Sequence, residues 1–287
     1  MSSESFTTVA ATIGGQTFLG MNALPTISVA MIATNEEKNL PRTLAALQGW
    51  VHEIVIVDSG SKDRSPEIAL EYGAKHSYNR DFRGHAEQKN IAIAQCTGDW
   101  ILLLDADEVV TPQLRMEIQG RVQNATVNAF WIPRLNIFMT RWMRHGGLFP
   151  DEKLRLFRRG MATVDESIGP HGTPQYKADK GHLRAHLEHY GYPDFANYLD
   201  HMNEYSTGTV VALGRRKAQA SDAALLLQSI ANPFFGWLKN YIFRGGFRDG
   251  AEGFIFHLNH AVYAHWKYVK VWEARKRAAA EAGHPNT

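Results

Sequence analysis

The stretch Trp100-Ile101-Leu102-Leu103-Leu104-Asp105-Ala106-Asp107-Glu108 places a run of large apolar residues directly before three carboxylates. Such a run is typical of a strand that is buried on both faces. Acids at the carboxyl end of a buried strand repel one another and lose hydration, so they require a nearby cation. A divalent ion that bridges them to the phosphates of a substrate is one interpretation, and a solvated acidic turn is the other.

The composition is that of a folded chain with one large domain or two. Its 287 residues are 44% apolar and 21% charged, unlike those of a disordered protein. The single cysteine, Cys96, fits a reducing compartment and is expected to be a small buried residue on a helix. Residues 1–23 lack a basic n-region, which predicts a flexible N-terminal extension and no secretory signal. No apolar run approaches the roughly 20 residues that cross a bilayer, so we expect a cytoplasmic protein.

The net charge of +2 hides a basic C-terminal part. Residues 215–277 carry a net charge of +7, which leaves −5 for the rest of the chain, and aromatic residues such as Phe234, Trp237 and Trp266 are interleaved with the bases. Aromatic side chains beside Lys and Arg suit an anionic membrane surface. Packing of helices against a catalytic domain is the alternative. No nucleic acid partner is expected, because no binding module is recognisable.

The first half of the chain alternates strands with helices. Strands are expected at 27–33, 53–58, 74–78 and 100–104, and Asn35 is expected to cap a helix that runs to about Leu47. Repeated units of this kind predict a mostly parallel sheet that is covered on both faces. Polar clusters at 34–36, 58–61 and 105–107 follow three of the strands. Because ligands bind outside the carboxyl ends of parallel strands, we expect these clusters to converge on one edge.

Several nucleotide-binding classes can be excluded by motif. The chain has no Gly-rich loop that ends in Gly-Lys-Ser/Thr, and Asn35-Glu36-Glu37-Lys38-Asn39 stands where a dinucleotide-binding domain would have spaced glycines. Phosphatases that form an aspartyl-phosphate usually have Thr or Val after Asp-x-Asp, where this chain has Glu108. The remaining interpretation is transfer of a group from a nucleoside diphosphate that a metal ion holds.

On these residues the chain resembles the inverting nucleotide-sugar glycosyltransferases of family 2, which have the GT-A fold. The matching segments are 27–36 (ISVAMIATNE), 56–63 (IVDSGSKD), 88–90 (QKN) and 104–108 (LDADE). A second set is similar to the lipopolysaccharide core β-glucosyltransferase branch: 147–151 (GLFPD), 155–159 (RLFRR), 188–190 (EHY) and 246–250 (GFRDG).

The resemblance implies an α/β fold and a domain plan. A GT-A (Rossmann-like) nucleotide-diphospho-sugar transferase domain with a mostly parallel sheet would occupy 24–195. Its nucleotide half would span about 24–125 and its acceptor half about 126–195. A helical, basic and aromatic region, 196–287, would follow, and membrane association is one interpretation of it.

The resemblance also implies a donor site. Asp58 would accept a hydrogen bond from the N–H of the nucleobase, although a helix-capping role is an alternative. Thr34 and Glu36 would line the same pocket. Lys89 stands where the family often has Arg, and it would neutralise phosphate without a bidentate fork. Arg155 would bind a phosphate group.

A divalent metal, Mg²⁺ or Mn²⁺, is the implied cofactor. Asp107 would be its principal ligand, Asp105 would face the ribose or the metal, and His189 would complete the set. A hydrogen-bonded core histidine is the alternative for His189. The ion would neutralise charge on the departing diphosphate.

An inverting transfer also needs a general base that takes the proton of the acceptor hydroxyl. Glu166 is the first candidate and Asp151 the second, with Glu152 and Asp165 less favoured.

The resemblance implies a hexosyltransferase that uses a UDP-sugar, with UDP-glucose first, and a lipid-linked saccharide acceptor such as a core heptose. It would act as a peripheral protein on the inner face of the cytoplasmic membrane. Transfer to a polyisoprenyl phosphate, or a non-catalytic membrane-associated protein that keeps a nucleotide pocket, are the alternatives.

Overall fold

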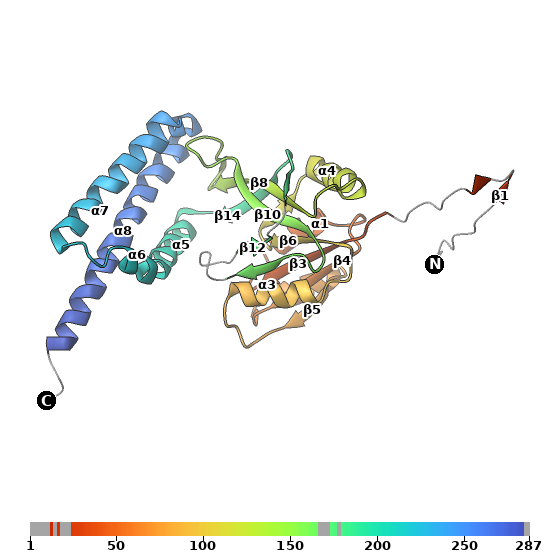
Figure 1. The fold of residues 1–287 in the computed structure, drawn as a ribbon, viewed down its shortest axis with the longest axis horizontal. Helices are drawn as coiled ribbons and strands as arrows, with labels where there is room; N and C mark the ends of the chain where they lie inside the picture. Colours follow the sequence, from red (N-terminus) through yellow and green to blue (C-terminus); the bar gives the residue numbers. More distant parts are fainter. Residues whose placement is uncertain (1–11, 14–15, 18–23, 166–172, 177–178, 284–287) are drawn as a thin grey trace.

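The computed structural model describes residues 12–13, 16–17, 24–165, 173–176 and 179–283, and it shows an α/β unit beside a group of helices (Figure 1). Most of the predicted N-terminal extension, 1–23, lies outside the described residues. Its described part is β1 (Thr12–Ile13), which pairs antiparallel with β2 (Gln16–Thr17).

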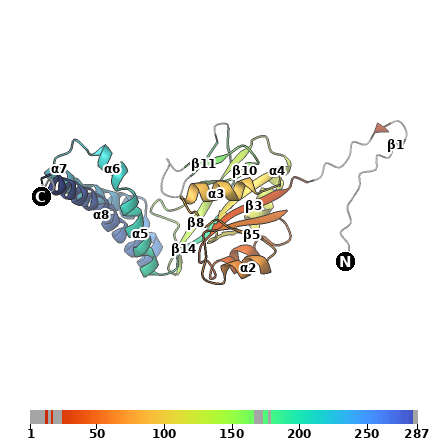
Figure 2. The same ribbon diagram turned by 90° about the horizontal axis from the view of Figure 1, so that it is seen from below.

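The first half of the sheet consists of four parallel strands, of which three are mostly apolar and the edge strand is polar. Their order in space is β5 (Lys75–Tyr78), β4 (Glu53–Asp58), β3 (Ile27–Ala33) and β6 (Trp100–Asp105). The helices α1 (Leu40–Ala45), α2 (Ser65–Glu71) and α4 (Pro112–Gln123) cover one face. The other face packs on α3 (His85–Ala94) (Figure 2). Burial on both faces explains why β4, β3 and β6 are mostly apolar, whereas β5 at the edge is partly exposed and carries polar residues.

The second half of the sheet is mixed. Next to β6 lie, in order, β10 (Asp151–Arg158), β8 (Ala129–Phe138), β14 (Leu187–Tyr192) and β7 (Glu108–Val110). The strand β10 is antiparallel to both β6 and β8, and β14 is antiparallel to β7. The short strands β9 (Arg141–Trp142) and β13 (Gly181–His182) also pair with β8, while β11 (Thr163–Asp165) pairs with β12 (Thr173–Gln175). The predicted α/β fold is confirmed: the sheet is wholly parallel over the first four strands and mixed beyond them, where β14 and β13 are parallel to β8.

The loop after β3 differs from its prediction. The helix begins at Leu40, with Asn39 at its N-terminus, so Asn35 does not cap it. Instead Asn35 adopts a left-handed backbone with φ 58°. Its backbone N–H donates to Ser61 Oγ (2.9 Å), and its side-chain oxygen accepts from the N–H of Lys62 (2.9 Å). Asn35 therefore fastens the loop after β3 to the loop after β4.

The C-terminal region is helical, as predicted. It contains α5 (Phe195–Gly208), α6 (Val210–Arg216), α7 (Asp222–Trp237), the π-helical η1 (Leu238–Phe243), the 3₁₀ turn η2 (Gly246–Asp249) and the long α8 (Gly250–Gly283). Within the described part of the chain, none of these helices has the length and apolar character needed to span a membrane.

Apolar and polar contacts attach the helices to the α/β unit. Phe138 of β8 packs with Tyr198 of α5 and Phe256 of α8 in a shared apolar cluster. Asp249, which is buried, accepts from the backbone N–H of His145 (2.8 Å) and from its ring Nδ1 (2.6 Å). The acid of the segment 246–250 thus holds the loop after β9.

Candidate functional site

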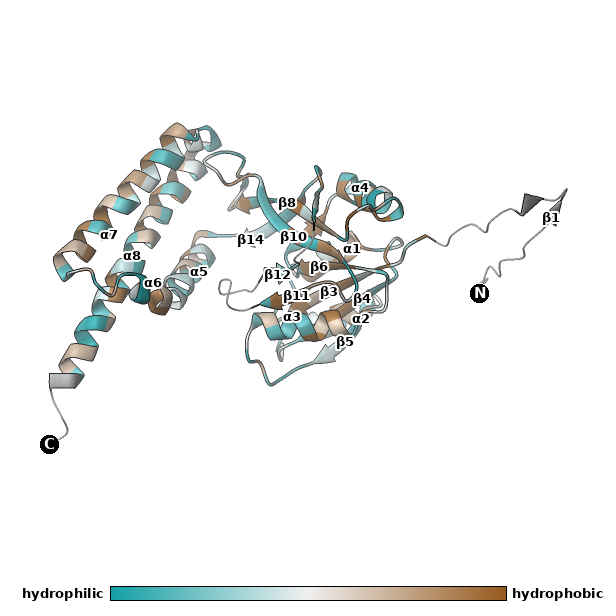
Figure 3. Ribbon diagram, in the orientation of Figure 1, coloured by the Kyte–Doolittle hydropathy of each residue, from teal (hydrophilic) through white to brown (hydrophobic). Residues whose placement is uncertain are grey.

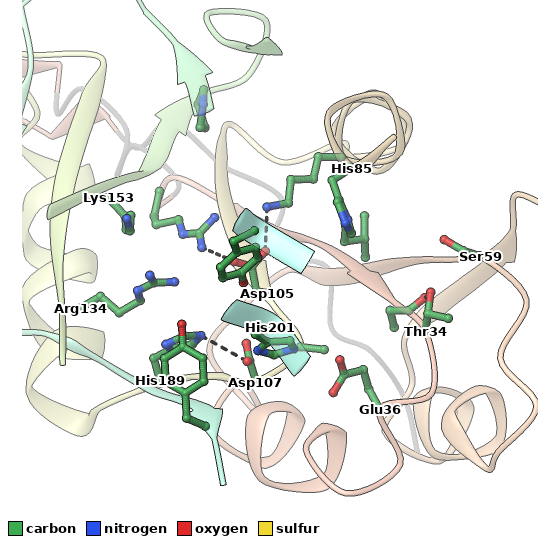
Figure 4. Close-up of a pocket in the computed structure, with 18 of the residues that line it drawn as sticks. Thr34, Glu36, Ser59, His85, Asp105, Asp107, Arg134, Lys153, His189 and His201 are labelled. Atoms are coloured by element: carbon green, nitrogen blue, oxygen red, sulfur yellow. Dashed lines mark hydrogen bonds and ion pairs between the residues drawn. The ribbon is translucent and has the colours of Figure 1, made fainter. Parts of the chain in front are cut away.

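The three polar clusters converge as predicted. Ala33 pairs in register with Asp58, and Ile32 pairs with Asp105, so the strand ends lie at one edge of the sheet. A cavity of about 900 Å³ opens there. Figure 4 shows Asp105 and Asp107 in its middle, between two groups of side chains. One group is Thr34, Glu36, Ser59 and His85, and the other is Arg134, Lys153 and His189.

Asp105 is neutralised by basic side chains of the protein itself. Its Oδ1 lies 2.8 Å from Nζ of Lys89, and its Oδ2 accepts from the guanidinium of Arg155. Burial alone would raise the pKa of Asp105, but Arg155 and Lys89 hold it well below its ordinary value. Each oxygen of Asp105 therefore already accepts from a basic side chain, and its charge is balanced without a metal ion.

Glu108 has the same character. It is fully buried, and its Oε1 accepts from Arg155 (2.6 Å) and from Arg134 (3.1 Å). Its Oε2 accepts from the backbone N–H of Asp105 (3.1 Å). The cations that the sequence requires beside Asp105 and Glu108 are therefore Lys89, Arg134 and Arg155.

Asp107 differs, because it faces the cavity beside a histidine. Its Oδ2 lies 3.2 Å from Nε2 of His189, whose Nδ1 lies 2.6 Å from Oδ1 of Asn136. If Nδ1–H donates to Asn136, a lone pair of Nε2 points at the carboxylate. Two such acceptors require a positive charge between them, which a proton or a metal ion can supply. Burial alone would raise the pKa of Asp107, but His189 keeps it below its ordinary value.

Asp107 and His189 fit a metal site in which the substrate supplies the remaining ligands. Among the described residues, no three His, Cys, Asp or Glu side chains are grouped to hold a metal ion. Mg²⁺ usually takes only one or two protein ligands together with the phosphates of a substrate, and imidazole is also acceptable to Mn²⁺.

Glu36 lines the same cavity, on the side of Thr34. Burial raises its pKa to about 7, and the negative charges of Asp107, Asp105 and Asp63 contribute to the shift. A hydrogen bond from Asn39 (2.9 Å) opposes it. Glu36 is thus a carboxyl group that exchanges its proton near neutral pH.

Asp58 is completely buried and does not line the cavity. Its Oδ1 accepts from the backbone N–H groups of Gly60 (2.6 Å) and Ser61 (2.7 Å), and its Oδ2 lies 3.3 Å from Nε2 of His76. These bonds fix the loop after β4, and because α2 begins only at Ser65, Asp58 does not cap a helix. The loop that Asp58 shapes carries Ser59, which does face the cavity.

The two candidate bases fare differently. Glu166 lies outside the described residues. Asp151 accepts two hydrogen bonds from Arg134 (3.0 and 2.8 Å) and forms an ion pair with Lys153 (2.9 Å). Burial alone would raise the pKa of Asp151, but Arg134 and Lys153 lower it. A carboxylate stabilised in this way is a weak proton acceptor.

Two sets of lining residues escaped the sequence analysis. Arg134 comes from the middle of β8, in a segment without a motif. The far wall of the cavity includes His201 and Tyr205 of α5 and Tyr263 of α8. No pattern in the sequence joins these helices to a strand end about a hundred residues earlier, so only the packing of α5 and α8 could reveal them.

Comparison with known proteins identifies the class. The model of glycosyl transferase family 2 matches residues 28–178, over half of the chain, and the chain therefore belongs to this family. The resemblance inferred from the motifs is confirmed: the protein is a glycosyltransferase with a GT-A fold.

Individual relatives differ in coverage. The lipopolysaccharide core biosynthesis glycosyltransferase LpsC of Rhizobium meliloti is 27% identical over 258 residues, 86% of this chain and 92% of that protein. An uncharacterized glycosyltransferase of Rickettsia typhi is 23% identical over 261 residues, 87% of each chain. A TPR repeat-containing protein of Synechococcus elongatus is 39% identical over 117 residues, but this stretch spans only 29% of its length and 41% of this chain. Among solved structures, S. aureus TarS 1–349 aligns over 88% of this chain and 92% of that chain, with 14% identity and a TM-score of 0.46.

Proposed function

We propose that this glycosyltransferase moves a hexose from a nucleoside diphosphate sugar, with UDP-glucose as the first candidate, to a lipid-linked saccharide such as the lipopolysaccharide core. The observation that carries the proposal is the Asp107–His189 pair, which faces the cavity among basic side chains. The name of LpsC supports a core acceptor. The enzyme would work at the inner face of the cytoplasmic membrane as a peripheral protein.

The charge balance of the site favours a metal-bound diphosphate. Four basic side chains, Lys89, Arg134, Lys153 and Arg155, face four carboxylates, Asp105, Asp107, Glu108 and Asp151. These charges cancel, so the protein alone would leave the charge of a bound diphosphate uncompensated. A divalent ion supplies the missing charge.

Asp107 and His189 would hold Mg²⁺ or Mn²⁺, and Asp105 would act beside them by orienting Lys89 and Arg155. When bound, the ion supplies Lewis-acid stabilisation of the leaving diphosphate. Lys89 and Arg155 would add hydrogen bonds to phosphate oxygens as the charge develops. Thr34 and Glu36 would contact the nucleoside, in a pocket shaped by the loop that Asp58 fixes.

The acceptor would enter against the wall that includes His201, Tyr205 and Tyr263. Aromatic rings offer the flat apolar faces of a saccharide a complementary surface. Glu166 would take the proton of the acceptor hydroxyl, because Asp151 is tied to Arg134 and Lys153. The acceptor oxygen then bonds to the anomeric carbon as the bond from that carbon to the diphosphate oxygen breaks.

Thermal unfolding in the presence of nucleotide sugars tests the proposal. We would compare UDP-, GDP-, CMP- and dTDP-sugars, with and without Mn²⁺, on the wild type, on Asp107→Ala and on a control. Glu67→Ala is a suitable control, since Glu67 is an exposed acid on α2 that does not line the cavity. We expect a rise in Tm of several degrees that needs both a UDP-sugar and metal and that only Asp107→Ala abolishes. A shift that is absent with every nucleotide would refute the donor site.

A further inference from the structure

The helix α7 turns an apolar face outward. Its buried residues, Leu225, Ser229 and Pro233, lie one turn apart and face α8, where the ring of His265 lies 3.0 Å from the carbonyl of Ser229. The side of α7 away from α8 carries large apolar side chains that are exposed. We call this set the outer face of α7: Leu226, Leu227, Ile230, Phe234 and Phe235.

The outer face of α7 has no cover within the described part of the chain. Leu227 is 69% exposed and Ile230 is 66% exposed. In both views of the ribbon, α7 lies on the side of α8 that is remote from the α/β unit (Figures 1 and 2). The brown colour of apolar residues is frequent along α7 (Figure 3). A contiguous apolar surface at the outer limit of a molecule marks a contact with something else.

The charges around α7 indicate what that contact is. Between Ala223 and Trp237 the helix carries no charged residue, and Asp222 at its start is paired with Lys276 (2.7 Å). Exposed bases stand at both ends. Arg215 and Arg216 precede the helix, whereas Lys239, Arg244 and Arg248 follow it. An apolar face with basic residues at each end matches the interface of an anionic bilayer, where lipid tails and negative head groups lie side by side.

We propose that the outer face of α7 is the surface by which this protein lies on an anionic membrane. The helix has 16 residues, so it would extend about 24 Å along the surface and would not cross it. A second copy of the chain fits less well, because pairing two such faces would bring basic residues of both copies together. This inference rests on the proposed function and deepens it, because a lipid-linked acceptor would lie at a membrane. The observations on α7 that support it are independent of the donor site.

Flotation with vesicles tests the inference on the full chain. The probes are vesicles of equal parts phosphatidylglycerol and phosphatidylcholine, and vesicles of phosphatidylcholine alone. The test variant is the double substitution Leu227→Glu and Ile230→Glu. The matched control is Leu70→Glu and Met116→Glu, which adds the same charge at two apolar positions of the α/β unit that are 63% and 65% exposed. All four positions are exposed, so the folded state is preserved.

We expect the wild type and the control to float with anionic vesicles. The α7 variant should bind these vesicles at least about tenfold more weakly, because two apolar side chains no longer enter the interface. Arg215→Gln with Arg216→Gln should weaken binding and reduce its dependence on salt. The UDP-sugar shift in Tm should be the same in all variants, which separates failure of this inference from failure of the proposed function.

Three results would overturn the inference. The first is a wild type that does not float with anionic vesicles, and the second is an α7 variant that floats as well as the control. The third is a dimer in lipid-free buffer, seen by analytical ultracentrifugation, that only the α7 variant disrupts; it would assign the outer face to a second copy.

Discussion

The three acids at the end of β6 have two opposite kinds of surroundings. Asp105 and Glu108 are saturated by Lys89, Arg134 and Arg155, whereas Asp107, which lies between them in the sequence, meets a histidine at the edge of the cavity. The difference lies in the number of basic partners and not in the spacing of the acids. In a motif of clustered carboxylates, those that the protein itself neutralises build the site, and the one left facing the cavity is available for chemistry.

Replacing Asp107 should separate chemistry from stability most sharply. For Asp107→Ala we expect kcat/KM for sugar transfer to fall about a thousandfold, because several kcal/mol of metal-based stabilisation are lost. The Tm without ligands should change little. Equal loss of activity in the Glu67→Ala control would contradict the assignment.

Replacing Glu108 should do the reverse. Glu108→Ala removes the fully buried carboxylate that lies between Arg134 and Arg155 and leaves these two with only Asp151 and Asp105, which costs about 3 kcal/mol or more of the free energy of unfolding. Urea unfolding of this variant beside Asp107→Ala measures the contrast. If Asp107→Ala were the more destabilised of the two, the distinction between Glu108, which stabilises the fold, and Asp107, which acts in the reaction, would be wrong.

Asn136 offers a smaller test, because it acts through His189. Asn136→Ala removes the acceptor beside Nδ1 of His189, so the ring is no longer held in the tautomer that presents Nε2. We expect the affinity for Mn²⁺, followed through the UDP-sugar shift in Tm, to fall about 10- to 100-fold. An unchanged affinity would remove His189 from the proposed ligand set.

Glu36 gives the smallest effect, and it depends on pH. The pKa of Glu36 is about 7 in the folded chain against 4.5 for the ordinary group, so between these values the folded state binds more protons than the unfolded state. The contribution of Glu36 to stability therefore falls as pH rises from about 4.5 to about 7. As pH rises over this window, the free energy of unfolding should fall less for Glu36→Gln than for the wild type. Urea unfolding at a series of pH values measures this difference. Parallel curves would show that burial and the neighbouring acids do not raise the pKa of Glu36.

The parts of the fold that depend on continuous apolar runs could be predicted. The strands 27–33 and 53–58 match β3 and β4, and the convergence of the polar clusters follows from parallel strands sharing one edge. The family could also be predicted, since its motifs lie on these strand ends. The mixed second half could not, because short strands such as β9 and β13 gain stability from their neighbours and not from their own residues.

The candidate site was predicted in part, for the same reason. Sequence placed Thr34, Glu36, Asp105 and Asp107 at the cavity, because each directly follows a strand. It did not indicate which acids would be paired, since Arg134 reaches Glu108 from another strand and Arg155 approaches from β10. The roles of Asp58, Lys89, Arg155, His189 and Glu166 stay predictions, and Asn136→Ala addresses that of His189.

The layering of the helices sets a reach for the enzyme. Residues of α5 and α8 line one wall of the cavity, and α7 packs on the other side of α8. Since neighbouring helices pack 8–10 Å apart, the outer face of α7 and the cavity are separated by roughly 15–20 Å. A protein resting on lipid through α7 would therefore work at a fixed height above the head groups. Such a spacer favours a hydroxyl carried several sugars above the bilayer over a polyisoprenyl phosphate at its surface.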